Sequence, residues 1–103
     1  RANACGLTQV LPRYTGSDST GVPRLTCEDL FDPITSITAG SMTLRYWVYS
    51  YGRKNLRVGL CGYNAGFRCK GKNPHRSGMF YSRTVLRTSE RIKRKVVELR
   101  RSN

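Results

Sequence analysis

Acidic residues are scarce in this sequence. Six Asp and Glu stand against nineteen Lys and Arg in 103 residues, which gives a formal net charge of +13. A charge of this size attracts polyanions at low salt. Nucleic acid, anionic lipid and the acidic peptides and teichoic acids of a bacterial wall all fit, and the charge alone does not choose among them.

Long apolar runs, a second histidine and closely spaced cysteines are also missing. No stretch approaches the roughly eighteen apolar residues that a membrane-spanning helix needs, so we expect no membrane span. His75 is the only histidine and lacks the kind of partner that a nucleophilic Ser or Cys requires, so we interpret it as solvent-exposed. The cysteines include no Cys-x-x-Cys pair, which argues against a zinc site. We therefore predict no metal site and no cofactor.

The four cysteines, Cys5, Cys27, Cys61 and Cys69, allow three disulfide pairings, and the sequence does not select one. A bond between Cys61 and Cys69 would clip the loop between them to the preceding helix. Disulfides would indicate an oxidising, extracytoplasmic setting. The alternative is four buried free thiols in a protein assembled in the cytosol, and we favour the disulfides.

A short buried helix that ends in a polar corner is the most informative stretch. Leu56, Leu60 and Tyr63 recur at i, i+4 and i+7, and Gly66 is placed to close the last turn in a left-handed conformation. The corner sets the phenol of Tyr63 and the carboxamide of Asn64 at the mouth of the core, where each needs a hydrogen-bond partner or a ligand. From chemistry alone, a structural role is favoured for both.

A longer core helix is predicted from Pro33 to about Tyr51, ending at Gly52. The small residues 39–41 would allow another segment to approach it closely. Aromatic residues in this helix could line a sugar groove, but at helical spacing they are more often part of the core. Those aromatic residues are Tyr46, Trp47 and Tyr49, and the predicted core stripe is Ile34, Ile37, Leu44, Trp47, Val48 and Tyr51.

The acidic residues before this helix are assigned to helix starts rather than to catalysis. Asp32 precedes Pro33, which is the pattern of an N-cap followed by proline at the first helical position. Glu28 and Asp29 are close by, where negative charge stabilises the start of a helix.

The rest of the chain is predicted to hold loops and one amphipathic helix. Residues 6–11 form a short helix or turn, residues 13–29 a loop, and residues 66–78 a basic loop. From about Met79 to Leu99 the pattern predicts an amphipathic helix with an apolar stripe, and the rest of its surface is strongly basic. This basic surface is either solvated or binds an anion. The stripe consists of Val85, Ile92, Val96 and Leu99.

Three motifs in the same order resemble those of lytic transglycosylases and goose-type lysozymes. Tyr63-Asn64-Ala65-Gly66 resembles the family's tyrosine-asparagine-alanine-glycine motif, and residues 6–9 resemble its glycine-leucine-methionine-glutamine segment. Residues 30–33, followed by Ile37 and Gly40, resemble its phenylalanine-asparagine-proline stretch. Thr8, Gly62 and Phe67 depart from the usual methionine, alanine and proline, which bears on fine specificity more than on membership.

The resemblance implies an all-α, lysozyme-like helical fold and one domain over residues 1–103. Carried over residue by residue, it assigns substrate binding to Gln9, Leu11, Tyr63 and Asn64. It implies one catalytic glutamate, which protonates the bond between N-acetylmuramic acid and N-acetylglucosamine and then accepts a proton from the C6 hydroxyl of the muramic unit.

The glutamate itself is not found at the matching position of this chain. In the family it lies on a helix before the glycine-leucine-methionine-glutamine segment, whereas only residues 1–5, none of them acidic, precede Gly6 here. We therefore expect a lytic transglycosylase-like domain that lacks its N-terminal catalytic helix, with the acid upstream of Arg1. Because the distinguishing carboxylates would lie upstream, the sequence does not separate a transglycosylase from a hydrolase.

These inferences predict a peptidoglycan-cleaving enzyme of the lytic transglycosylase type. We expect it to be periplasmic, secreted or associated with a virion, with peptidoglycan and other virion or cell-envelope chains as partners. The alternative is a catalytically incomplete module that binds glycan, or nucleic acid through its basic face. The charge is the only feature in favour of nucleic acid, because no diagnostic nucleic-acid-binding motif is present.

Overall fold

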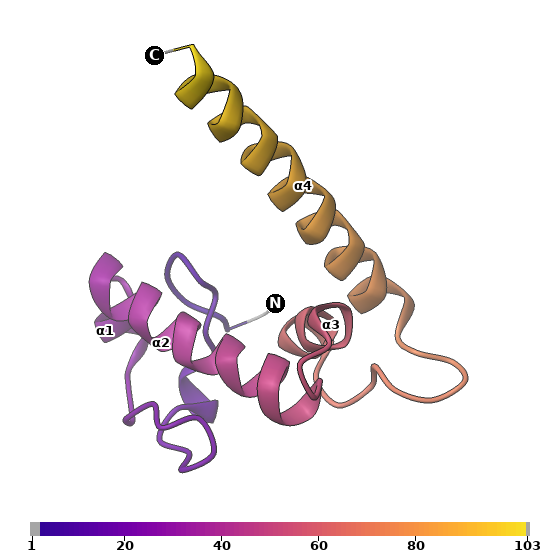
Figure 1. Cartoon of the computed structure of the whole chain (residues 1–103). Helices are drawn as coiled ribbons and strands as arrows, with labels where there is room; N and C mark the ends of the chain where they lie inside the picture. Colours follow the sequence, from indigo (N-terminus) through magenta and orange to yellow (C-terminus); the bar gives the residue numbers. More distant parts are fainter. Residues whose placement is uncertain (1–2, 103) are drawn as a thin grey trace.

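The computed structural model of the chain describes residues 3–102 and is built from helices and loops (Figure 1). No strand occurs among these residues, and an isolated bridge between Cys5 and Val10 is the only β pairing within them. The all-α expectation is thus confirmed. The elements in chain order are η1 (Pro12–Tyr14), α1 (Cys27–Leu30), α2 (Pro33–Arg45), the π-helix η2 (Tyr46–Tyr51), α3 (Leu56–Ala65) and α4 (Arg76–Arg101).

Helix α2 begins where the sequence predicted. The side chain of Asp32 accepts hydrogen bonds from the hydroxyl of Thr35 at 2.7 Å and from its backbone N–H at 3.0 Å. These two bonds, the hydroxyl first, hold the pKa of Asp32 below its usual value. Pro33 occupies the first helical position, where its missing N–H costs nothing. The carboxylate of Asp32 is therefore a helix cap.

The predicted helix over residues 33–51 has the expected length, but its last six residues adopt π geometry. The backbone N–H of Gly52 donates to the carbonyl of Trp47, five residues earlier, at 2.7 Å. This wider turn ends at Gly52, as the sequence predicted.

Helix α2 buries its small residues rather than its isoleucines, which corrects part of the predicted core stripe. Its buried side chains are Ser36 and Ala39, together with Gly40, and they face the N-terminal loop. Ile34 and Ile37 are exposed. The loop backbone packs so closely on α2 that only small residues fit between them. The core under this loop is made of Cys5, Val10, Val22, Leu30 and Ala39.

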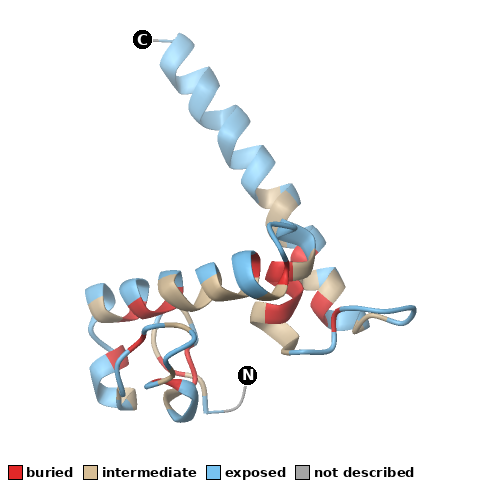
Figure 2. Ribbon diagram, turned by 60° about the horizontal axis from the view of Figure 1, so that its bottom comes forward, coloured by how far each residue is buried: buried red, intermediate tan, exposed pale blue. Residues whose placement is uncertain are grey.

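A second buried region lies where α3 meets η2 and α4 (Figure 2). Leu60 and Cys61 of α3 are buried there, together with Val48 of η2. Gly78 of α4 lies so close to α3 that a methyl group on it would be 2.7 Å from the sulfur of Cys61. The buried hydroxyl of Ser82 donates to the carbonyl of Arg57 at 2.7 Å, which fixes α4 against α3.

Two disulfides select one of the three possible pairings. Cys5 is bonded to Cys27, with their Cα atoms 5.5 Å apart, and Cys61 is bonded to Cys69, with their Cα atoms 5.9 Å apart. The second bond closes the loop after α3, as the sequence suggested. The first bond ties the N-terminal loop to the start of α1.

Helix α4 differs from the prediction at both ends. It starts at Arg76, and Nδ1 of His75 accepts a hydrogen bond from the N–H of Gly78 at 3.1 Å, so this histidine is a half-buried N-cap rather than a solvated side chain. Beyond Val85 the predicted apolar stripe has no partner in the described chain, because every residue from Ser89 to Ser102 is exposed.

No helix within residues 3–102 combines the length and the apolarity needed to cross a membrane.

The close approach of the N-terminal loop to α2 gives a first test. A methyl group on Gly40 would lie 2.5 Å from both Cβ and Oγ1 of Thr8, so we expect Gly40→Ala to destabilise the fold by about 1–3 kcal/mol. Ser41→Ala, at the next and exposed helix position, serves as the control and should cost little. Urea unfolding measures both. Equal midpoints for Gly40→Ala and the parent chain would contradict the packing described here.

Candidate functional site

Tyr63 joins the end of α3 to the N-terminal loop. Its hydroxyl donates a hydrogen bond to the backbone carbonyl of Thr8 at 2.7 Å, across 55 residues of chain. The helix ends two residues later, and the N–H of Gly66 donates to the carbonyl of Gly62 at 2.7 Å. Gly66 has φ +81° and ψ −150°. The positive φ is as predicted, but this ψ belongs to a region used by glycine rather than to the left-handed helical region.

Two hollows meet at Tyr63. The first, which we call the aromatic cleft, has a volume of about 400 Å³ and is lined by Leu11, Tyr14, Tyr46, Trp47, Tyr63 and Phe67, among others. The second, which we call the upper hollow, has a volume of about 440 Å³ and is lined by Leu7, Gln9, Leu44, Tyr63, Asn64 and Tyr81, among others. Tyr63 lines both hollows and so separates them.

The four predicted substrate-binding residues are divided between the two hollows, and only Tyr63 lines both. Leu11 is buried and lines the aromatic cleft, whereas Gln9 and Asn64 line the upper hollow. Gln9 has φ +55°, an uncommon backbone conformation for a residue other than glycine. Its side-chain Nε2 donates to the carbonyl of Gly6 at 2.9 Å, which stabilises this turn.

An aromatic cluster forms one wall of the aromatic cleft. The ring of Trp47 lies 4.8 Å from that of Phe67, 5.1 Å from that of Tyr51 and 5.2 Å from that of Tyr46, measured between centroids. The tilted and edge-on geometries are those that aromatic pairs prefer. The half-buried Tyr46 and Trp47 thus line the cleft, whereas Tyr49 is exposed and does not line it.

The loop after α3 positions Phe67 at the cleft. The Cys61–Cys69 disulfide closes this loop, and the backbone N–H of Cys69 donates to the hydroxyl of Tyr51 at 3.0 Å. Phe67 keeps 69 % of its surface exposed although it contacts the Trp47 ring. Gly62 makes room for that ring, because a methyl group on Gly62 would lie 2.5 Å from it.

No carboxylate lines either hollow in the described part of the chain. Two acids cap helices and two are paired with lysines on α4, whereas Asp18 is exposed in a loop and Glu28 lies in the first turn of α1. Within residues 3–102, no cluster of His, Cys, Asp or Glu could hold a metal ion. The capping acids are Asp29 and Asp32, and the paired ones are Glu90 and Glu98.

Sequence reasoning missed the roles of Thr8 and Phe67, because it treated both as departures from a family pattern. Thr8 is hydrogen-bonded to Ser36 of α2 as well as to Tyr63, so it sets the position of the loop that carries Gln9 and Leu11. For Phe67 the sequence did contain a signal of its position at the cleft. It is an apolar residue placed directly after Gly66, inside a loop bounded by two cysteines.

Comparison with known families supports the resemblance that the motifs indicated. The model of the transglycosylase SLT domain matches residues 1–85. The chain belongs to this family. The match covers the N-terminal loop, α1 to α3 and the start of α4, and therefore the residues that line both hollows. Membership confirms the lysozyme-like helical fold and points to a transglycosylase-type enzyme that acts on peptidoglycan. No curated protein and no solved structure matches the chain.

The bond from Tyr63 to Thr8 gives a second test. Tyr63→Phe removes the hydroxyl that satisfies the carbonyl of Thr8, so we expect the free energy of unfolding to fall by about 1–2 kcal/mol. Tyr49→Phe removes an exposed hydroxyl and is the matched control. Urea unfolding measures the free energy of unfolding of both variants. A loss for Tyr63→Phe no larger than that for Tyr49→Phe would show that the bond contributes nothing.

Proposed function

We propose that residues 1–103 form the glycan-binding part of a lytic transglycosylase that cleaves peptidoglycan between N-acetylmuramic acid and N-acetylglucosamine. The observation that carries this proposal is the aromatic cleft beside Tyr63 in a chain of the transglycosylase SLT domain family. Ligand sites are commonly concave and lined by apolar and aromatic side chains, with a few polar groups that fix orientation. In the aromatic cleft, Trp47 and Phe67 offer ring surfaces to the apolar side of a sugar. In the upper hollow, Asn64 offers a carboxamide to the polar groups of a neighbouring sugar unit.

The reaction needs one ionisable group that acts twice. A glutamic acid protonates the glycosidic oxygen as the bond to the muramic C1 breaks. The resulting carboxylate then accepts the proton of the muramic C6 hydroxyl while that oxygen attacks C1, which gives a 1,6-anhydro ring. The acid is regenerated, and no water is consumed. Such a group needs a pKa near the working pH, which an apolar surrounding can supply.

We propose that this glutamate is contributed by a segment that precedes Arg1 and packs beside the upper hollow. Two features support the assignment. None of the six carboxylates of the chain lines either hollow. The upper hollow is lined by Leu7, Leu44 and Tyr81, and Leu7 is largely exposed, so an apolar helix face could cover it. Tyr63 and Asn64 border this hollow and would orient the carboxyl group from there.

Product analysis tests the reaction type. Peptidoglycan digested by the polypeptide that includes the preceding segment should release muropeptides with 1,6-anhydro ends, each one water lighter than a hydrolysis product. Mass spectrometry separates the two product classes. Release of reducing ends only would overturn the transglycosylase assignment in favour of a goose-type hydrolase, and no release of either kind would overturn the enzyme proposal.

Phe67 and Phe80 provide a matched pair for testing the cleft. Both phenylalanines are exposed, at 69 % and 64 % of their surface, but only Phe67 lines the aromatic cleft. We expect Phe67→Ala to weaken the binding of isolated glycan strands about five- to tenfold, because it removes a stacking surface. Phe80→Ala should leave binding unchanged. Calorimetric titration measures both, and equal affinities for the two variants would rule out the cleft as the glycan site.

We propose an extracytoplasmic or virion-associated location. The two disulfides support an oxidising compartment, because such bonds persist outside the cytosol. Peptidoglycan as substrate points to the same side of the membrane. Virion association rests on the high charge of the chain alone.

A further inference from the structure

The C-terminal part of α4 projects away from the rest of the molecule (Figures 1 and 2). We call residues 87–101 the projecting segment. It spans about 22 Å at the helical rise per residue. From Ser89 onward every side chain in it is exposed. The segment also lies beyond residues 1–85, which the family model matches, so family membership does not account for it.

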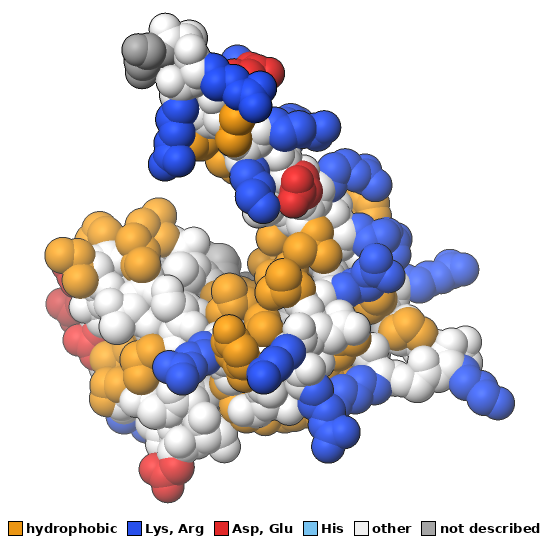
Figure 3. All heavy atoms as spheres, viewed as in Figure 1, with side chains coloured by type: hydrophobic (Ala, Val, Ile, Leu, Met, Phe, Trp, Pro, Cys, Tyr) orange, Lys and Arg blue, Asp and Glu red, His pale blue; other side chains and the backbone are white. Residues whose placement is uncertain are grey.

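The projecting segment has two contrasting faces. Ile92, Val96 and Leu99 follow one another at i, i+4 and i+7 and therefore share one face of the helix. Their exposed fractions are 56 %, 42 % and 57 %, although each is apolar. Figure 3 shows apolar side chains along α4 between basic ones. On the opposite face, successive arginines stand seven residues apart, at Arg87, Arg94 and Arg101.

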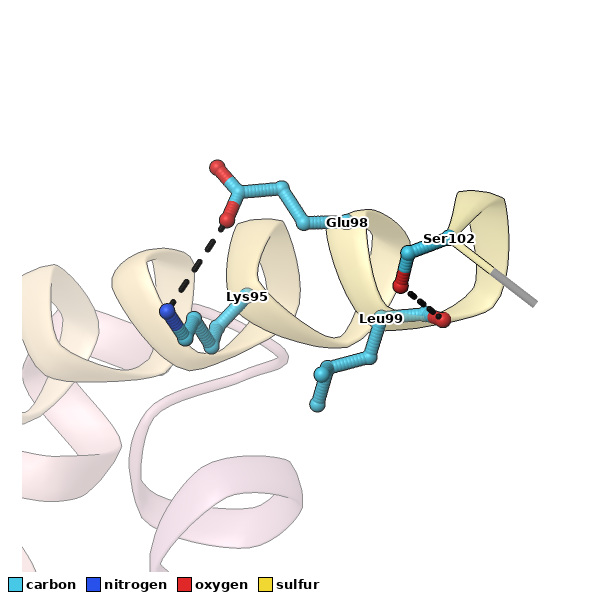
Figure 4. A network of polar contacts seen from close by, with 4 residues as sticks. All are labelled: Lys95, Glu98, Leu99 and Ser102. Carbon is cyan, nitrogen blue, oxygen red and sulfur yellow. Dashed lines mark hydrogen bonds and ion pairs between the residues drawn. The ribbon is translucent and has the colours of Figure 1, made fainter.

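The net charge of the protein is confined to the half of the chain that contains this segment. Residues 53–103 hold fifteen Lys and Arg against two Glu, whereas residues 1–52 hold four basic and four acidic residues. Among residues 3–102, two ion pairs offset the charge on α4. Glu90 pairs with Lys93 at 3.9 Å, and Glu98 pairs with Lys95 at 4.0 Å, as Figure 4 shows. Both pairs are exposed and so contribute little. The basic face therefore stays largely uncompensated within the described chain and is available to an anionic partner.

A second copy of the chain does not fit the apolar stripe. In a heptad register Ser82 and Ser89 would occupy seam positions, which weakens a coiled coil. Lys93, Lys95 and Arg100 flank the same seam, and two copies would bring these like charges together. Nucleic acid fits the charge, but a phosphate backbone gives exposed isoleucine, valine and leucine nothing to pack against.

We propose that the projecting segment binds the surface of a membrane that contains anionic phospholipids. A helix with a basic face and a narrow apolar stripe lies in the plane of such a surface, with its apolar side chains among the upper parts of the acyl chains. Ile92, Val96 and Leu99 enter that layer. The basic side chains that flank the stripe, Lys93, Lys95 and Arg100, contact lipid phosphates. The segment would hold the rest of the chain beside a membrane. This inference does not depend on the proposed function of the cleft.

Vesicle flotation of the whole chain tests the inference. The probes are vesicles of phosphatidylcholine mixed with phosphatidylglycerol and vesicles of phosphatidylcholine alone, and we expect binding to the mixed vesicles only. Changing Ile92→Gln together with Val96→Gln keeps the charge and should lower the partition coefficient at least about tenfold. Circular dichroism confirms that the helix persists, which is expected because neither side chain contacts the body of the protein.

Charge variants complete the test. Lys93→Gln, Lys95→Gln and Arg100→Gln together, which flank the apolar stripe, should lower binding to the mixed vesicles by about tenfold or more. Arg53→Gln, Lys54→Gln and Arg57→Gln remove the same charge from exposed positions of the body and should have a much smaller effect. Equal losses for the two triple variants would overturn the inference.

Two further outcomes would also overturn it. The first is binding to duplex DNA, but not to mixed vesicles, that Ile92→Gln and Val96→Gln leave unchanged. The second is a dimer in sedimentation that the same two changes dissociate. Loss of vesicle binding with unchanged glycan binding by the apolar variant would separate this inference from the proposed function of the cleft.

Discussion

Thr8 is the point at which the N-terminal loop is fixed to both α2 and α3. Its hydroxyl donates to the carbonyl of Ser36 at 2.7 Å, and its N–H donates to the hydroxyl of Ser36 at 3.2 Å. Its own carbonyl accepts the bond from Tyr63. Gly40 leaves the space that the Thr8 side chain occupies. The hollows on either side of Tyr63 exist because these contacts set the distance between the loop and the two helices.

Local signals in the sequence predicted the start of α2 and the ends of η2 and α3, but not the short helix α1 or the start of α4 at Arg76. The cap at Asp32, the end of the long helix at Gly52 and the end of α3 at Gly66 each depend on neighbouring residues, and the structure confirms all three. The Cys61–Cys69 bond joins residues only eight positions apart and was also within reach of local reasoning. The bond between Cys5 and Cys27 was not, because four cysteines are compatible with three pairings.

Tertiary packing decided what local signals could not predict. Helical periodicity placed Ile34 and Ile37 in the core, but the N-terminal loop packs on the small residues of the adjacent face instead. Periodicity likewise identified the stripe of α4 and could not show that most of it lacks a partner. His75 was interpreted as solvated because it lacks the kind of partner that a nucleophilic Ser or Cys requires, whereas its capping role depends on the position of the Gly78 N–H.

The substrate-binding role of the residues that the motifs selected stays a prediction, and their arrangement could not be predicted from the motifs. The motifs selected Gln9, Leu11, Tyr63 and Asn64, and the structure places all four at the junction of the N-terminal loop and α3. That Leu11 lines a different hollow from Gln9 and Asn64 follows only from the three-dimensional fold. The aromatic wall combines a π-helix with a disulfide-closed loop, so no single stretch of sequence contains it.

We propose that the chain supplies the glycan-binding surfaces and that its catalytic acid is contributed from outside residues 1–103. The intact mass of the natural polypeptide, together with the sequence of its N-terminal peptides, tests this claim most directly. We predict a mass above the 11.7 kDa of these residues and a glutamate in the preceding segment. A mass of 11.7 kDa with Arg1 as the first residue would contradict the claim that the acid belongs to the same polypeptide.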